Sequence, residues 1–156
     1  RVWPISAMKD WIEHFRTIAH ALPVSHVWRG HGTALLVELG RLTPTTRRDG
    51  AYGHAEGEIG VMIEWSWRVE DEQTILCGSW SDEGLWQPTF AHLVGQRVDD
   101  IKTFGRLPEI QLSLSGGFHI VSFMTAEGDP EWTLFDRRGP KTITVGCRSG
   151  VITECE

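Results

Sequence analysis

Histidine and cysteine are the residue types in this chain that could hold a metal ion or carry a nucleophilic step, and the 156 residues contain seven histidines and three cysteines. His14 and His20 lie six positions apart on a predicted helix, so their side chains point in different directions. The chain contains no HExxH, no CxxC and no paired Cys/His spacing of the kind a zinc site uses. We therefore expect surface or locally hydrogen-bonded histidines, no metal site and no cofactor.

Cys77, beside Gly78 and Ser79, is the candidate nucleophile. A catalytic thiol needs a lowered pKa and a partner histidine, and the neighbouring sequence supplies neither. Ser79 lacks the GxSxG frame of a nucleophile elbow, and the glycine-rich stretches 30–32 and 53–60 lack the lysine and the following helix of a phosphate loop. The sequence favours a buried cysteine on a strand and predicts no catalytic residue.

Carboxylates occur in close groups at three places. They are Asp82 with Glu83, Asp99 with Asp100, and Glu127 with Asp129 and Glu131. A glycosidase-type acid and base must lie roughly 5 to 10 Å apart across a cleft, which a sequence does not show. Two interpretations therefore stay open, namely solvated surface charges and an acidic surface that recognises a partner.

The charge is unevenly divided along the chain. The formal net charge is -6, but residues 1–50 carry seven basic and four acidic residues, whereas residues 51–156 carry eight and 17. An acidic field speeds association with a basic partner and imitates nucleic acid to a nuclease, and it also keeps a lone protein soluble. The chain has no Lys/Arg-rich run, so we expect no nucleic-acid partner.

Composition sets the broad class. With 40% hydrophobic and 23% charged residues, the chain is typical of a globular protein, and we expect a single domain over 1–156. No apolar run approaches the roughly 18 to 20 residues of a membrane span, so we expect no membrane association. The odd number of cysteines without a CxxC pair, and an N-terminus that does not look like a signal peptide, favour the cytoplasm.

Tryptophan is the most unusual residue type, with eight copies. Trp11, Trp65 and Trp67 occupy positions predicted to face the core. Trp80 and Trp86 enclose a short polar turn. These two indoles either form a protein-binding hot spot with the neighbouring acidic groups, or close the edge of the core.

Hydrophobic periodicity predicts the elements that must position these residues. Apolar residues recur at steps of three and four from Met8 to Leu22, which predicts an amphipathic helix capped by Ser6. From Ile59 to Val69 the period is two, which predicts one long strand. Further strands are predicted at 24–29, 33–39, 74–80, 98–104, 109–115, 118–124, 131–136, 142–147 and 151–154. Residues 43–57 are predicted to form a long mobile loop.

The predicted strands fall into two similar sets, 24–86 and 94–156. Four pairs of segments match in the same order: 24–27 with 98–101, 35–40 with 110–115, 67–71 with 132–136, and 74–78 with 142–146. Either one β-rich unit is used twice, or the likeness is that of any two antiparallel meanders. Both interpretations predict an α+β fold in which an antiparallel β-sheet architecture is accompanied by one N-terminal helix.

Strand-and-turn motifs follow one another through most of the chain. They are Trp65–Val69, Ile75–Ser79 with Asp82, Leu93–Val98, Leu112–Leu114 with Gly117, and Glu131–Phe135. Their order, from about residue 33 to the C-terminus, resembles a family of small uncharacterised bacterial β-rich proteins. The motifs describe a scaffold and carry no catalytic residue. In size and style the chain is also similar to the immunity proteins encoded beside bacterial polymorphic toxins, which act by binding and blocking a toxin.

We therefore expect a non-enzymatic protein-binding module, an immunity-type inhibitor of a basic toxin. Its expected partner-binding residues are Trp80, Asp82, Glu83, Trp86, Asp99, Asp100, Glu127 and Asp129. One alternative is a small-ligand protein or enzyme with a pocket between the strand sets, lined by Trp65, Trp67 or Trp132 and with a histidine at its mouth. The other is a structural subunit that forms a homodimer through an exposed sheet edge.

Overall fold

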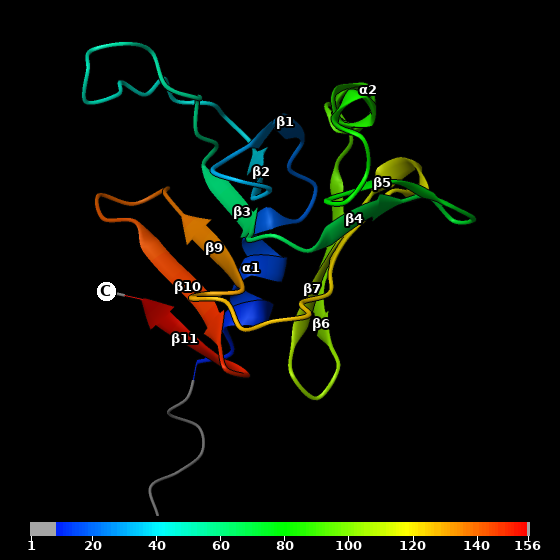
Figure 1. Cartoon of the computed structure of the whole chain (residues 1–156). Helices are drawn as coiled ribbons and strands as arrows, with labels where there is room; N and C mark the ends of the chain where they lie inside the picture. The colour runs from blue at the N-terminus through cyan, green and yellow to red at the C-terminus, as the bar shows by residue number, and fades with distance from the viewer. Residues whose placement is uncertain (1–8, 156) are drawn as a thin grey trace, which may run out of the picture.

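The computed structural model describes residues 9–155. Over this part of the chain, strands dominate, with two short α-helices, α1 (Trp11–Ala19) and α2 (Trp86–Leu93) (Figure 1). The strands are β1 (Val24–Arg29), β2 (Leu35–Leu39), β3 (Ile59–Ile63), β4 (Trp67–Glu70), β5 (Ile75–Gly78), β6 (Val98–Phe104), β7 (Glu109–Leu114), β8 (His119–Ser122), β9 (Trp132–Asp136), β10 (Ile143–Arg148) and β11 (Val151–Cys155). The predicted α+β fold class, with antiparallel sheets and an N-terminal helix, is confirmed.

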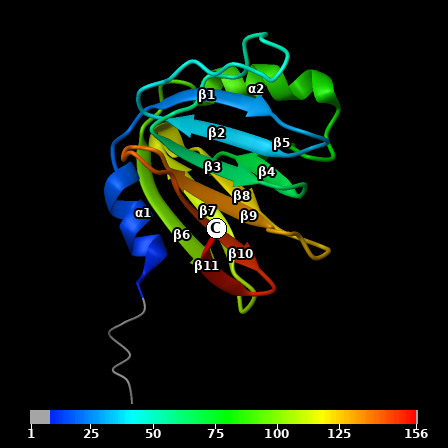
Figure 2. The ribbon, with the colours of Figure 1, turned by 90° about the vertical axis from the view of Figure 1, so that its left-hand side faces the viewer.

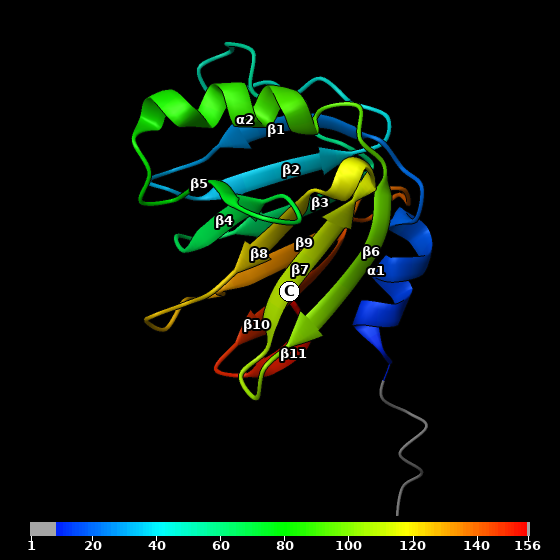
Figure 3. The same ribbon diagram turned by 90° about the vertical axis from the view of Figure 1, so that its right-hand side faces the viewer.

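The strands form two antiparallel sheets that share one core. One sheet has the order β1-β2-β3-β9-β10-β11 and faces the viewer in Figure 2, and the other has the order β5-β4-β8-β7-β6 and faces the viewer in Figure 3. Burial alternates along the strands, most clearly in β7, where Ile110, Leu112 and Leu114 are buried. The apolar inner faces of both sheets contribute to one cluster of buried residues, which includes Trp67 and Trp132.

The two halves of the chain follow the same route through the sheets. Strands β1-β2-β3 form a meander in the six-stranded sheet and β4-β5 then pair in the other, whereas β6-β7-β8 form a meander in the five-stranded sheet and β9-β10 then pair in the first. The four matched pairs of sequence segments lie on equivalent strands. The helices also pack on equivalent strands, because α1 packs on β6 and α2 packs on β1, and β1 and β6 are the first strands of the two halves. An origin by duplication stays a prediction, and this shared route supports it.

Helix α1 begins after Asp10, whose carboxylate accepts a hydrogen bond from the backbone N–H of Glu13 at 3.0 Å. Its buried stripe consists of Ile12, Phe15 and Ala19. The helix ends early because Ala21 adopts a positive φ of 65° and its N–H donates to the carbonyl of Val98. Helix α1 is therefore shorter than predicted, and the predicted cap at Ser6 lies outside the described residues.

The predicted long strand from Ile59 to Val69 is two strands in different sheets, so this prediction is wrong. β3 ends at Ile63 and β4 begins at Trp67, and the bend between them carries the chain from one sheet to the other. The period of two continues across the bend because both strands bury one face.

Helix α2 occupies a segment for which the sequence predicts no helix, and it packs on β1 and β5. Its buried residues recur at steps of three and four, and they are Trp86, Thr89, Phe90 and Leu93. Pro88 lies in the first turn, where a missing N–H breaks no helical hydrogen bond. Neither helix in residues 9–155 combines the length and the apolar composition needed to cross a membrane.

Residues 43–57, which we call the finger, form a loop whose two arms pair with each other. The two arms pair at Thr43 with Glu56 and at Thr46 with Tyr52. The finger connects β2 to β3 and projects from the body of the molecule (Figure 1). The segment is a loop, as predicted, in which paired backbone N–H and C=O groups hold the two arms together, and its mobility stays a prediction.

Candidate functional site

Trp80 lies in the turn after β5, and its side chain is 92% exposed. Two other apolar side chains share its surroundings, Ile75 of β5, which is 60% exposed, and Phe123 just after β8, which is 38% exposed. All three line one hollow of about 260 Å³. We call Ile75, Trp80 and Phe123 the Trp80 patch. Contiguous exposed apolar side chains of this kind are typical of an interaction surface.

Hydrogen bonds fix the turn that carries Trp80. The N–H of Gly78 donates to Oγ of Ser81 at 2.9 Å, and the N–H of Ser81 donates to the carbonyl of Gly78 at 3.0 Å. Ser79 is buried, and its Oγ accepts a hydrogen bond from the backbone N–H of Trp67 at 3.2 Å. Because Ser79 turns inward, the side chain of its neighbour Trp80 is held outward.

Arg68 is the basic residue of the hollow, and a carboxylate partly neutralises it. Its guanidinium carbon lies 5.6 Å from the centroid of the Phe123 ring, and its Nε donates to Oε2 of Glu70 at 2.9 Å. The contact with the guanidinium helps to hold the Phe123 ring at the surface.

The chain segment that carries Ile75 and Trp80 of the patch is rich in acidic residues. Residues 64–83 contain six acidic residues and one basic residue, so this segment has a net charge of -5, against -6 for the whole chain. Hydrogen bonds from the backbone N–H groups of Gln73 and Thr74, both at 2.8 Å, lower the pKa of Asp71 and keep it ionised. The patch therefore has an acidic border.

Of the predicted residues nearest the patch, Asp82 is exposed, and Glu83 is exposed and pairs with Arg29, with 2.7 Å between Oε1 and Nη1. Trp86, in contrast, is only 4% exposed. The Trp86 ring packs against that of Trp67, with 5.6 Å between the centroids, and its Nε1 donates to the carbonyl of Gly78 at 2.9 Å. Trp86 therefore belongs to the core and supports the turn from below, which corrects its placement on the partner-binding surface.

Asp99 and Asp100 lie elsewhere on the molecule. They belong to β6, which is the opposite edge strand from β5 in the five-stranded sheet. Oδ1 of Asp100 also accepts a hydrogen bond from Nε of Arg16 at 2.9 Å. The charge of Asp100 is therefore already paired with that of Arg16 on α1. The structure thus separates this pair from the Trp80 patch.

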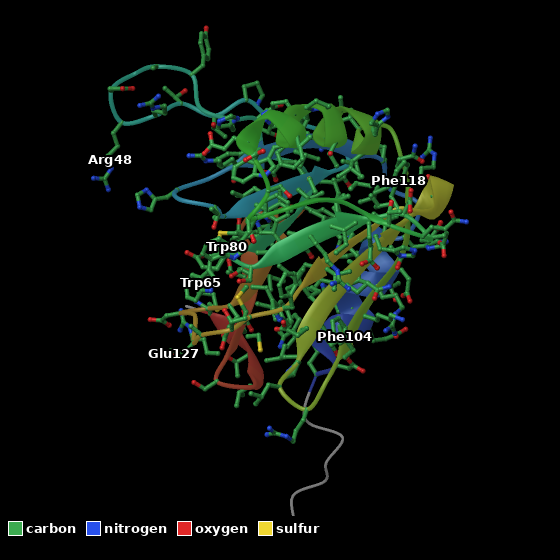
Figure 4. The ribbon with its side chains drawn as sticks, turned by 45° about the vertical axis from the view of Figure 1, so that its right-hand side comes forward. Arg48, Trp65, Trp80, Phe104, Phe118 and Glu127 are labelled. Carbon is green, nitrogen blue, oxygen red and sulfur yellow. The ribbon has the colours of Figure 1, made fainter. Side chains whose placement is uncertain are left out.

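Glu127 and Asp129 are exposed in the connection from β8 to β9, which begins at Phe123 of the patch. Figure 4 shows Trp65, Trp80 and Glu127 on the same side of the molecule. Asp129 forms an ion pair with Arg148, with 2.8 Å between Oδ1 and Nε. Glu127 is therefore the acidic residue of this connection that best extends the border of the patch.

Within residues 9–155, tryptophan side chains occupy the space between the sheets where the alternative interpretation expected a pocket. Trp67 and Trp132 are fully buried, and their Nε1 groups donate to the carbonyls of Thr33 at 2.6 Å and Pro108 at 3.0 Å. Trp65, in the bend after β3, is half-buried. Trp67 and Trp132 stabilise the core, and Trp67 also lines the hollow of the Trp80 patch.

A cleft of about 510 Å³ lies where the connections after β6, β8 and β10 meet, and it contains Glu109, Glu131 and Cys147. Burial, and the neighbouring charge of Glu131, raise the pKa of Glu109. Burial, and the same carboxylate, raise the pKa of the Cys147 thiol to about 11. Burial also raises the pKa of Cys77, so both thiols are protonated at neutral pH and are poor nucleophiles.

The histidines take local partners. Nε2 of His14 lies 3.3 Å from Oδ2 of Asp136, and Nε2 of His26 lies 3.1 Å from Nδ1 of His54. Among residues 9–155, no set of three or more His, Cys, Asp or Glu side chains is grouped closely enough to hold a metal ion.

Sequence reasoning missed Ile75 and Phe123. Both lie in segments predicted as strands, and their exposure follows from an edge position and a strand end, respectively. Comparisons of the chain with protein-family models, with curated proteins and with solved structures found no match. The function is therefore inferred from the geometry of the site itself.

Proposed function

We propose that this protein is a non-enzymatic binding module that captures a basic protein through the Trp80 patch, and that it acts as an immunity-type inhibitor of a basic bacterial toxin. The observation that carries the proposal is the 92% exposure of the Trp80 side chain on a turn fixed by hydrogen bonds.

A rigidly held indole is a suitable anchor for a protein partner. Tryptophan contributes a large contact area at a small cost in conformational entropy, and it is enriched among the residues that dominate interface energies. Ile75 and Phe123 extend the apolar surface around the indole. The fixed turn means that little ordering is required on binding.

The acidic border selects the class of partner. Asp82, Glu83 and Glu127 are exposed near the patch, and the segment that carries the patch holds most of the net negative charge. Such a field accelerates association with a basic surface and disfavours acidic competitors. A toxin that cleaves nucleic acid carries a basic surface of this kind, and blocking that surface would inhibit it.

We place this activity in the cytoplasm. All three cysteines are unpaired, which is consistent with a reducing compartment. An immunity-type inhibitor acts where a toxin would reach its target, so the proposed compartment and the proposed activity agree.

The test begins with capture of the partner from a lysate of the host at low and at high salt. The captured protein is identified by mass spectrometry and purified, and its affinity is then measured by calorimetry. Binding of a basic protein that weakens as salt increases is expected. Trp80→Ala should reduce the affinity at least about tenfold, as for a hot-spot residue.

Matched variants separate the patch from general effects. The double variant Asp82→Lys with Glu83→Lys should weaken binding, whereas Asp99→Lys with Glu154→Lys, which makes the same change in net charge at exposed positions elsewhere, should weaken it less. Tyr52→Ala, at a 90% exposed aromatic residue on the finger, is the control for Trp80. If Trp80→Ala and Tyr52→Ala bind equally well, the proposed surface is wrong.

A further inference from the structure

The outer face of the six-stranded sheet holds a second site, on elements that the proposed function does not use. Strand register places Trp28 of β1 opposite Leu36 of β2, and Gly60 of β3 between Glu38 of β2 and Phe135 of β9. Because Gly60 has no side chain, a space is left above it between the side chains of Glu38 and Phe135.

Arg137 fills the space above Gly60. A Cβ atom at Gly60 would lie 2.8 Å from Nη1 of Arg137, so only glycine allows the guanidinium to sit there. Nη1 donates to Oε1 of Glu38 at 3.0 Å, and Nε lies 3.0 Å from Oε2 of Glu56 on the finger. The guanidinium carbon also lies 4.8 Å from the centroid of the Phe135 ring.

Glu38 joins the sheet to the finger. It is only 1% exposed although it lies on the outer face, and it accepts hydrogen bonds from Nε1 of Trp28 at 2.9 Å and from the N–H of Gly57 at 3.3 Å. A buried carboxylate with this many donors is stable only in a fixed arrangement. Trp28, Arg137 and the base of the finger are therefore held in place together.

The finger forms one wall of a hollow on the outer face of the six-stranded sheet. The ring of His54 stacks on that of Trp28, with 4.1 Å between the centroids and 10° between the planes. Oγ1 of Thr45 donates to the carbonyl of His54 at 2.7 Å. The finger and the connection between β9 and β10 project on the same side of the sheet (Figure 1).

The result is a basin of about 980 Å³, which we call the finger basin, between the finger, the ends of β1 and β2, and strands β9 and β10. Its volume is in the upper part of the range for small-molecule sites. Its lining offers several kinds of group. Trp28, Leu36 and Phe135 supply apolar and aromatic surface, Thr45, Thr142 and Thr144 supply hydroxyl groups, Arg47 supplies a guanidinium group, and Glu56 supplies a carboxylate that is paired with Arg137.

Arg47 has only an exposed partner. Its Nη2 lies 3.5 Å from Oδ2 of Asp49, and both side chains are exposed. Ion pairs between exposed side chains contribute little to stability. Arg47 can therefore exchange this partner for the anion of a ligand, whereas Arg137 is committed to Glu38 and Glu56. The guanidinium of Arg29 lies on the other face of the sheet, against Glu83 and Trp86.

We propose that the finger basin binds a nucleoside phosphate. The base packs on the surface of Trp28, Leu36 and Phe135, the sugar hydroxyls bond to the threonine hydroxyls, and Arg47 takes the phosphate. Arginine suits this role because its planar group of donors matches the oxygens of a phosphate. Recognition here uses side chains of strands and of the finger, and needs no glycine-rich phosphate loop.

Calorimetric titration of the full chain with AMP, adenosine and ribose 5-phosphate tests the proposal. AMP should bind saturably, and adenosine and ribose 5-phosphate should each bind at least about tenfold more weakly, because each lacks one of the recognised parts. If AMP gives no saturable binding at millimolar concentration, the proposal is wrong. It is also wrong if ribose 5-phosphate binds as well as AMP, because the aromatic surface then has no role.

Variants of the finger locate the site. Arg47→Ala should weaken AMP binding at least about fivefold, whereas Arg48→Ala, the adjacent exposed arginine that does not line the basin, should leave it unchanged. Circular dichroism checks that both variants fold. If Arg47→Ala and Arg48→Ala bind AMP as tightly as the unmodified chain, or lose affinity to the same extent, AMP does not occupy the finger basin and the proposal is overturned.

Discussion

Arg29 and Glu83 connect the end of β1 to the segment that follows the Trp80 turn. Nη1 of Arg29 lies 2.7 Å from Oε1 of Glu83. The guanidinium carbon of Arg29 also lies 5.2 Å from the centroid of the Trp86 ring. One side chain thus contacts Glu83 of the acidic border and Trp86, the first residue of α2.

The Arg29–Glu83 contact should contribute little to the stability of the fold. Both side chains are exposed, and ion pairs of this kind contribute less than about 1 kcal/mol. In a double-mutant cycle of Arg29→Ala and Glu83→Ala, measured by urea unfolding, we expect a coupling energy below about 1 kcal/mol. Arg29→Ala should cost more than Glu83→Ala, because it also removes the contact with Trp86. A coupling energy above about 2 kcal/mol would assign this pair a structural role.

Gly60→Ala should destabilise the protein by about 2 kcal/mol. The added Cβ would lie 2.8 Å from Nη1 of Arg137, so the guanidinium must move away from Glu38, a buried carboxylate that then loses a partner. Urea unfolding measures the loss. Gly84→Ala is the matched control, because a Cβ there meets no atom within 4 Å. Equal stability of the two variants would show that Arg137 is not held over Gly60.

Hydrophobic periodicity and turn residues predict most of the fold, because an element that buries one face repeats apolar residues at a regular spacing. The steps of three and four in α1 and the alternation in β7 are both visible in the residues. Helix α2 is not predicted from the sequence because its buried residues span only two turns and because the segment contains Pro88. The bend between β3 and β4 is not predicted from the sequence, because apolar and polar residues alternate in the same way before and after it.

The sites were less predictable because they depend on tertiary packing. Trp80 and Trp86 are the same residue type in one short segment, and only the start of α2 decides that Trp86 is buried. Asp99 is remote from Trp80 because strand order places β6 far from β5. The finger basin depends on the absence of a side chain at Gly60 and on Arg137, which lies 77 positions further along the chain.

Acidification should loosen the finger through His26. Burial, and then the neighbouring charge of His54, lower the pKa of His26, whereas Glu38 acts in the opposite direction. A histidine with a lowered folded-state pKa stays neutral while the unfolded chain takes up a proton, so stability present at neutral pH is lost as the pH falls below about 6.5. We expect the fall in melting temperature between about pH 7 and pH 5 to be smaller in His26→Gln than in the unmodified chain. His20→Gln, at an exposed histidine after α1, should show the unmodified fall, and a similar fall in both variants would contradict this account.

Asp136 should contribute stability that acid removes. Hydrogen bonds from the Arg138 side chain, with further ones from its backbone N–H and from His14, lower the pKa of Asp136 to about 2, against the opposing effect of burial. Because this pKa is below the usual value, the ionised group stabilises the fold by about 2 kcal/mol above pH 4, and the effect is lost as the pH falls toward 2. Asp136→Asn should therefore reduce the free energy of unfolding in urea by about 2 kcal/mol at pH 7, and by progressively less at about pH 4 and pH 3. Asp99→Asn, at an exposed carboxylate on β6, is the control. The free energies of unfolding of Asp136→Asn and of the unmodified chain should approach each other as the pH falls. If the difference between them stays the same, the neighbours of Asp136 do not stabilise its charge.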